Sequence, residues 1–545
     1  MGAAVLGARD LTGCEHRLAL DNAARVTGTA GSEVESPDAR RRIEAATAHR
    51  HEVIATITAM LAEQAATVVT IDDALPYRER ADRTAAACAA GVDWIFWATL
   101  PTDVERGRRG HAEALIRQGD GYVPLIVVNH RVTNPAKAGR DPSEPATLRT
   151  SGLARWAPRP DPTRTSRGNK RDTMRLAQLA AMLADLGHPP APERGAWAGG
   201  VIGTDADCIL VVPLGATMAD YEATFARRRA IAEGSIATAP RRINQCRSCD
   251  WWPDCEQELI AADDVSLVIG GNGTSMLADA GITTVSQLAD YRGAPPADWS
   301  GHTSFRDAVV QANCRRAGVS LVRRLERPRV QRADVEVDVD MESFGERGAY
   351  LWGTLLTENT CDEPVLYRPF VTWDPLPTVD EGRAFGRFWQ WLTERRRTAH
   401  REGKTFAAYC YSQQAENRWL RGSADRFAGI PGVPTRAEVD AFIASPEWVD
   451  IYEAVNENFI CPNGKGLKKV APVAGFAWDD PEAGGEASMD WYQAAVGLDG
   501  SPLDVSQRAR LLRYNEDDVQ ATKVLREWLS SDEILELPTV DDLLR

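Results

Sequence analysis

A strictly alternating run of apolar and acidic residues, VEVDVDME at positions 335–342, constrains this chain more than any other feature. In a β-strand, successive side chains point to opposite faces. The apolar positions would therefore face a core, and a row of carboxylates would project from the other face: Glu336, Asp338, Asp340 and Glu342. Such a row is costly without cations, because neighbouring carboxylates raise one another's pKa. The run predicts either a divalent-metal site or an exposed edge strand with a solvated acidic face.

Further candidate acidic residues lie later in the chain. The segment LLRYNEDDVQATKVLREWL predicts a long helix over about residues 505–530, on which Tyr514 and Asp518 are four residues apart and share one face. Glu416 lies in AYCYSQQAENRWL, where a strand is followed by a helix. From the alternating run onward, the pattern predicts three strands, a helix, a strand and a helix. This is the opening order of a ribonuclease-H-like α/β domain.

The combination of Asp-x-Glu on a first strand with Tyr-x-x-x-Asp on a late helix resembles the DEDD exonucleases of the tyrosine subtype. Residues 329–545 resemble more closely the YprB-type ribonuclease-H-like exonuclease domain. Asp450 in WVDIYEAV and Lys468 in GKGLKKVAP lie in segments similar to that family. Glu416 stands where the wider superfamily often has Asp, which is a departure from the pattern.

This resemblance implies two-metal phosphodiester hydrolysis. Two Mg²⁺ or Mn²⁺ ions would be held by four carboxylates: Asp340, Glu342, Glu416 and Asp518. Hard carboxylate oxygens select these metals over softer ones. Tyr514 would orient the nucleophilic water. Lys468 would either contact a phosphate or be an ordinary surface lysine. Glu336 and Asp338 would either bind the metals themselves, support the ligands or lie at the surface.

Three of the ten cysteines are clustered as Cys246-x2-Cys249-x5-Cys255. In a reducing compartment such a cluster favours metal binding over disulfides. A four-thiolate site needs one more ligand, and Cys14 is the candidate. A lone N-terminal cysteine followed much later by C-x2-C-x5-C resembles the iron–sulfur staple of RecB-like nucleases, which implies a [4Fe–4S] cluster. A Zn²⁺ site is the first alternative, and free structural thiols are the second.

The same resemblance covers residues 1–260 and implies a PD-(D/E)xK active site. The chain offers Glu113 for the first acid and Gln178 for the helix motif, but Asn129 and Arg131 stand where Glu-x-Lys belongs. Asparagine cannot supply an anionic metal ligand, and arginine is too firmly protonated to replace the lysine. We therefore expect a degenerate, DNA-binding nuclease fold in this region. His130 could rescue metal binding, although a structural histidine is the simpler interpretation.

The chain is expected to be a multidomain α/β protein that resembles fused RecB-like nucleases. Residues 1–260 would form a RecB-like restriction-endonuclease-like domain, 261–328 a helical connector with a helix-hairpin-helix-like element, and 329–545 the ribonuclease-H-like domain. Hydrophobic residues make up 43% and charged residues 26% of the 545 positions, as in ordinary globular proteins. No apolar run is long enough for a membrane span, so a cytoplasmic protein is expected.

The formal net charge of −15 excludes a histone-like nonspecific binder, but not an enzyme that binds nucleic acid through metals and a local basic groove. The favoured function is a metal-dependent 3′–5′ exonuclease, with DNA preferred over RNA. The alternative is a non-catalytic nucleic-acid-binding or repair scaffold in which both nuclease folds are degenerate. The intact carboxylate set with Tyr514 favours catalysis, and the broken site at Asn129 and Arg131 favours loss of activity only in the first half.

Overall fold

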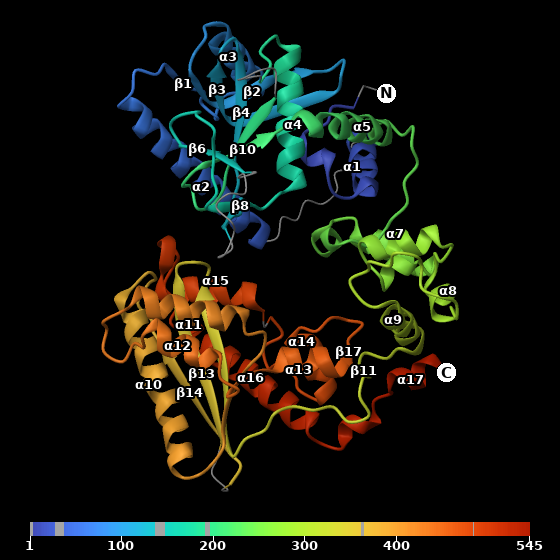
Figure 1. Cartoon of the computed structure of the whole chain (residues 1–545), viewed down its shortest axis with the longest axis vertical. Coiled ribbons are helices and arrows are strands. Elements are labelled where there is room, and N and C mark those ends of the chain that lie inside the picture. Colours follow the sequence, from blue (N-terminus) through green and yellow to red (C-terminus); the bar gives the residue numbers. More distant parts are fainter. Residues whose placement is uncertain (1–3, 28–36, 137–147, 191–196, 361–364, 483) are drawn as a thin grey trace. The chain divides into compact units, whose positions relative to one another are not determined.

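Figure 1 shows the structure, a computed structural model, with the chain coloured along its sequence. It describes residues 4–27, 37–136, 148–190, 197–360, 365–482 and 484–545. The chain divides into two units, Met1–Leu259 and Ile260–Arg545. Both contain helices and mixed sheets, which confirms the expected α/β class. Within the described ranges, no helix is both long enough and apolar enough to cross a membrane.

An eight-stranded sheet organises the first unit, with the strand order β1-β2-β3-β4-β9-β10-β6-β7. These strands are β1 (Val68–Thr70), β2 (Trp94–Asp103), β3 (Arg108–Gln118), β4 (Gly121–Val127), β6 (Arg149–Ser151), β7 (Arg159–Pro160), β9 (Ala198–Ile202) and β10 (Ile209–Pro213). A separate pair is formed by β5 (Thr133–Pro135) and β8 (Arg164–Ser166).

Helices α2 (Pro37–Ala62) and α4 (Lys170–Asp185) cover opposite faces of the central strands. Phe96 of β2 packs among the apolar side chains of α2, whereas its neighbour Ile95 packs among those of α4. This follows from the alternation of side chains along a strand. The other helices of this part of the chain are α1 (Glu15–Thr27), α3 (Tyr77–Ala89), α5 (Gly215–Ala232) and α6 (Trp252–Ala261).

The second unit begins with short helices and continues into a five-stranded sheet. The helices are α7 (Asn272–Asp279), α8 (Val285–Ala289) and α9 (Phe305–Ala317). The sheet has the order β14-β13-β12-β15-β16. Its strands are β12 (Val335–Phe344), β13 (Gly348–Glu358), β14 (Leu366–Val371), β15 (Phe406–Cys410) and β16 (Trp448–Asp450). A small additional sheet pairs β11 (Val322–Arg323) with β17 (Phe459–Ile460).

The acidic strand β12 lies at the centre of this sheet, antiparallel to β13 and parallel to β15. The alternative of an exposed edge strand with a solvated acidic face is therefore wrong. Glu336 and Asp338 are both fully buried, with 0% of each residue exposed. The cost of burying these charges must be met inside the protein, because water does not reach them.

Two long helices cover the two faces of β12. On the apolar face, α10 (Val379–Arg401) packs Phe388 and Leu392 against Val337 and neighbouring residues. On the acidic face, α16 (Ser506–Leu529) packs across β12 and β13. The remaining helices are α11 (Gln414–Arg426), α12 (Arg436–Ile443), α13 (Ile451–Asn458), α14 (Leu467–Val470), α15 (Gly485–Val496) and α17 (Val540–Leu544).

Candidate active site

Three carboxylates from β12 and α16 meet at one point of the second unit. Asp340 and Glu342 lie two residues apart on β12 and so share its acidic face, and Asp518 reaches them from α16. Each contributes one oxygen to a group in which all three atoms lie within 4.8 Å of one another. This separation is short enough for a single divalent ion to bridge the three oxygens.

The pKa values of this triad are raised because the carboxylates are buried together. Burial, followed by repulsion from Asp518, raises the pKa of Asp340 to about 8. Burial and repulsion from Asp340 hold the pKa of Glu342 well above its usual range. Burial also raises the pKa of Asp518, and the charge of Lys468 opposes that effect. Clustered carboxylates with raised pKa values favour a bound cation, so the arrangement is compatible with metal binding.

Glu416, in the first turn of α11, lies near Asp340 but outside this triad. It is 5% exposed, and its Oε2 atom has no hydrogen-bond partner among the described residues. Burial raises its pKa well above the usual range, with repulsion from Asp340 as the next cause. A buried, unpaired carboxylate oxygen beside a ligand carboxylate is what a second metal position would require.

Asp450 has a structural role in positioning α11. Its two carboxylate oxygens accept hydrogen bonds from the backbone N–H groups of Ser412 and Gln413, at 2.8 and 3.0 Å. Ser412 has a φ of 70°, a conformation that side chains other than glycine rarely adopt. Asp450 therefore stabilises the strained turn between β15 and α11, the helix that carries Glu416.

Lys468 of α14 and Trp478, further along the chain, lie on the other side of Tyr514 and Asp518. The Lys468 Nζ donates to the hydroxyl of Tyr514 at 3.2 Å and lies 4.5 Å from the centre of its ring. The Trp478 Nε1–H donates to Asp518 Oδ1 at 2.7 Å. Burial, followed by repulsion from Glu342, raises the pKa of Tyr514, so its hydroxyl keeps its proton. Tyr514 is thus held beside Asp518 as a neutral donor.

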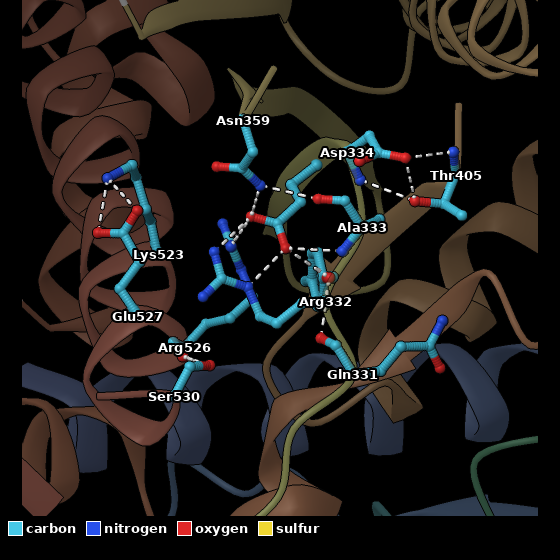
Figure 2. A network of polar contacts seen from close by, with 12 residues as sticks. Gln331, Arg332, Ala333, Asp334, Asn359, Thr405, Lys523, Arg526, Glu527 and Ser530 are labelled. Carbon is cyan, nitrogen blue, oxygen red and sulfur yellow. Dashed lines mark hydrogen bonds and ion pairs between the residues drawn. The ribbon is translucent and has the colours of Figure 1, made fainter. Parts of the chain in front are cut away.

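The other two carboxylates of β12 are neutralised by Arg526 of α16 rather than left for a metal. The guanidinium is fully buried and donates to Asp338 Oδ2 at 2.7 Å, and it also forms a short contact with Glu336. Figure 2 shows Arg526 directed from α16 toward this cluster, near Arg332 and Asn359. The sequence alone does not identify Arg526, although its position two turns after Asp518 on the same helix is the available signal.

Glu336 also receives hydrogen bonds from several other donors. Arg332 donates through Nε at 2.7 Å and Nη2 at 2.9 Å, and Asn359 and the Tyr409 hydroxyl each donate at 2.9 Å. Burial opposes ionisation of Glu336, but the hydrogen bonds from Arg332 and the charge of Arg526 outweigh it and lower the pKa to about 2. The acidic row of β12 therefore has two halves. Glu336 and Asp338 are paired with Arg526, whereas Asp340 and Glu342 have no guanidinium partner among the described residues.

The four predicted cysteine ligands line one pocket of the first unit: Cys14, Cys246, Cys249 and Cys255. Arg228 of α5, which is buried, donates to the backbone carbonyls of Asp10, Thr12 and Gly13 and so fixes the segment before Cys14. Burial raises the pKa of the Cys255 thiol to about 11, and repulsion from the other thiols adds to this. No three of the four sulfur atoms belong to a group within 4.8 Å.

The residues predicted for the first-half nuclease site do not form a metal-binding group among the described residues. Glu113 of β3 is buried and accepts from Arg175 Nη2 and from the backbone N–H of Val127, both at 3.0 Å. Asn129 follows β4. Two further side chains have other partners, since Arg131 pairs with Asp205 and Gln178 donates to the carbonyls of Leu6 and Arg109. The Arg175 guanidinium thus lies against Glu113, where a metal ion would have to bind.

Residues 427–530 match the family model of the RNase_H superfamily. The matched segment contains Asp450, Lys468, Tyr514 and Asp518. No curated protein and no solved structure matches the chain. The C-terminal part of the chain is therefore ribonuclease-H-like, as predicted, and such a domain points to nuclease-type activity on nucleic acid. The RecB-like first half stays a prediction.

Replacing Arg526 by methionine is expected to destabilise the second unit by about 3–5 kcal/mol, because Glu336 and Asp338 would keep buried charges without a cation. Urea unfolding followed by fluorescence measures this loss. Arg513→Met on the exposed side of the same helix is the matched control, with an expected change within about 0.5 kcal/mol. Adding Glu336→Gln and Asp338→Asn to the Arg526 variant should restore much of the stability. An unchanged unfolding midpoint in the single variant would contradict the assignment.

Proposed function

We propose that the chain is a metal-dependent nuclease that hydrolyses phosphodiester bonds in its C-terminal domain. The finer proposal is a 3′–5′ exonuclease with DNA preferred over RNA, which follows the resemblance to the tyrosine-subtype exonucleases. One observation carries the proposal: carboxylate oxygens of the half-buried Asp340 and the buried Glu342 and Asp518 lie within 4.8 Å of one another, with no guanidinium partner in the described structure. Asp518 lies in the segment that matches the RNase_H superfamily.

The donor set of this site suits Mg²⁺ or Mn²⁺, because all of its ligand atoms are carboxylate oxygens. Asp340, Glu342 and Asp518 would hold one ion, and Glu416 with Asp340 would hold a second. Bound ions would supply a reactive water and stabilise the departing 3′ oxygen. Tyr514 keeps its proton and can donate it in a hydrogen bond to that water. Lys468 places a positive charge beside this hydroxyl, where it can contact a scissile phosphate.

Asp340→Asn and Asp518→Asn should each lower Mn²⁺-dependent cleavage of end-labelled single-stranded DNA by more than about 100-fold, because each replaces an anionic ligand by a neutral amide. Gel analysis of DNA and RNA substrates, each labelled at one end, reports rate, polarity and preference. Asp517→Asn is the matched control, since Asp517 neighbours Asp518 on α16 but lies outside the triad. Equal cleavage by wild type and both variants would leave the non-catalytic scaffold as the better proposal.

The stability of the metal-free protein should fall as pH rises from about 4 to about 8. The pKa of Asp340 is raised to about 8 in the folded state, against about 3.9 when unfolded. The folded protein therefore retains a proton that the unfolded chain releases across this window, and stability is lost by up to about 1.4 kcal/mol per pH unit. Melting in EDTA at several pH values measures the slope. Asp340→Asn should flatten the dependence of stability on pH, and Mn²⁺ should stabilise the protein more at high pH than at low pH. A stability that rises with pH across this window would contradict the expectation.

For the first half we propose a degenerate RecB-like domain at residues 1–260 that carries a [4Fe–4S] cluster, followed by a connector at 261–328 and the nuclease domain at 329–545. Four cysteines lining one pocket support a thiolate-bound group. A single Zn²⁺ with ligands at about 2.3 Å would need sulfur atoms about 3.8 Å apart. The wider spacing of these sulfurs favours the larger cluster, and the bound group would tie Cys14 to α6.

Anaerobically purified protein should contain iron and acid-labile sulfide with little zinc, and it should be brown. Cys14→Ser is expected to lose most of the iron and to lower the melting temperature of the first unit, because one of four thiolate ligands is removed. Metal analysis and visible absorbance measure both effects. Cys208→Ser is the control, since this half-buried cysteine lies outside the pocket. A colourless, zinc-rich protein would overturn the cluster assignment.

A further inference from the structure

Asn515 is the residue that directly contacts the ligand carboxylate of Asp340. It follows Tyr514 on α16 and is fully buried, with 0% exposed. Its Nδ2 donates to Asp340 Oδ2 at 2.7 Å. The hydroxyl of Tyr367 on β14 donates to Asn515 Oδ1 at 2.8 Å. Burial raises the pKa of Tyr367, so its hydroxyl remains a donor, and the amide must then present its NH₂ group to Asp340.

The space for this contact is made by Gly353 on β13. Gly353 is the register partner of Asp340 across the two strands. A Cβ atom at this position would lie 1.6 Å from Asn515 Oδ1, a separation that no side chain allows. Only glycine therefore lets the Asn515 amide approach the sheet closely enough to reach Asp340. Residues from β12, β13, β14 and α16 thus form one contact.

The contact between Asn515 and Asp340 differs chemically from the contact between Arg526 and Asp338, which lies two residues before Asp340 on β12. Arg526 neutralises Asp338, whereas Asn515 orients Asp340 without adding charge. The other two members of the triad are treated in the same way, since Ser488 Oγ hydrogen-bonds Glu342 Oε2 at 3.1 Å and Trp478 Nε1 donates to Asp518. A neutral donor fixes the carboxylate and leaves its negative charge for a cation.

We propose that Asn515 is a positioning residue for metal binding, which holds Asp340 through one oxygen while Tyr367 fixes the orientation of the amide and Gly353 provides the space. This inference rests on the proposed metal site. The Asn515 amide would act through Asp340 and not as a ligand itself, so its effect would be on the affinity of Asp340 for the ion. Loss of a hydrogen-bond partner of this kind typically weakens metal binding about 10–100-fold.

Asn515→Asp tests the proposal, because it keeps the shape of the side chain and replaces the donor by an acceptor that repels Asp340. Mn²⁺ affinity of the full chain, measured by titration calorimetry and by electron paramagnetic resonance of the free ion, should fall about 10–100-fold. Asn458→Asp is the matched control. Asn458 is also a buried asparagine of the second unit, but it donates to the carbonyls of Arg329 and Ala454. It should lose melting temperature and keep its Mn²⁺ affinity.

Tyr367→Phe is the second test if Asn515→Asp does not fold. It removes only the hydroxyl that fixes the amide, so it should fold and show a smaller loss of Mn²⁺ affinity. Equal affinity in wild type, Tyr367→Phe and any folded Asn515→Asp would overturn the inference, as would an equal loss in Asn458→Asp. If wild type itself binds no Mn²⁺, the proposed nuclease site fails, which is a distinct result.

Discussion

The packing of α16 on the acidic face of β12 is the contact on which the second unit depends. Placing four carboxylates in a row inside a protein is costly unless other groups compensate their charge. Arg526 compensates Glu336 and Asp338, and the same helix carries Asp518 to the other end of the row. Because the ion pairs fix how α16 lies on the strand, they also fix where Asp518 meets Asp340. One helix therefore carries both the buried guanidinium and the third carboxylate of the triad.

The two ends of the acidic row on β12 differ in the charge of the groups that contact them. Where the protein supplies a guanidinium, the carboxylate is satisfied and has no need of a metal. Where it supplies only neutral donors, as with Asn515, Ser488 and Trp478, the carboxylate is oriented but remains uncompensated. The pKa of Glu336 is lowered to about 2 and that of Asp340 is raised to about 8, whereas burial raises the pKa of Asp338 against the opposing charge of Arg526. The charge of the contacting residue thus separates the carboxylates paired with Arg526 from those of the proposed metal site.

The sequence predicts local features of the second unit well, because they depend on periodicity. The alternation at 335–342 predicts β12, and the apolar spacing predicts α16. It cannot predict which side chains meet across elements. The contact of Asn515 with Gly353 depends on the register between β12 and β13 and on the position of α16, and no local pattern encodes either. The edge-strand alternative failed for the same reason, since strand order is set by tertiary packing and not by one strand's composition.

The first unit also places a carboxylate on a central strand, but there the carboxylate is paired with an arginine. Glu113, like Asp340, is a carboxylate on a strand, but it is fully buried and its partner is Arg175 on α4 rather than a neutral amide. By the distinction drawn for β12, Glu113 belongs with Asp338, and a metal would have to displace a guanidinium to bind it. The substitution of Asn129 and Arg131 at the expected ligand positions removes further negative charge. Sequence and geometry therefore both favour the second unit over the first as the place of the proposed metal site.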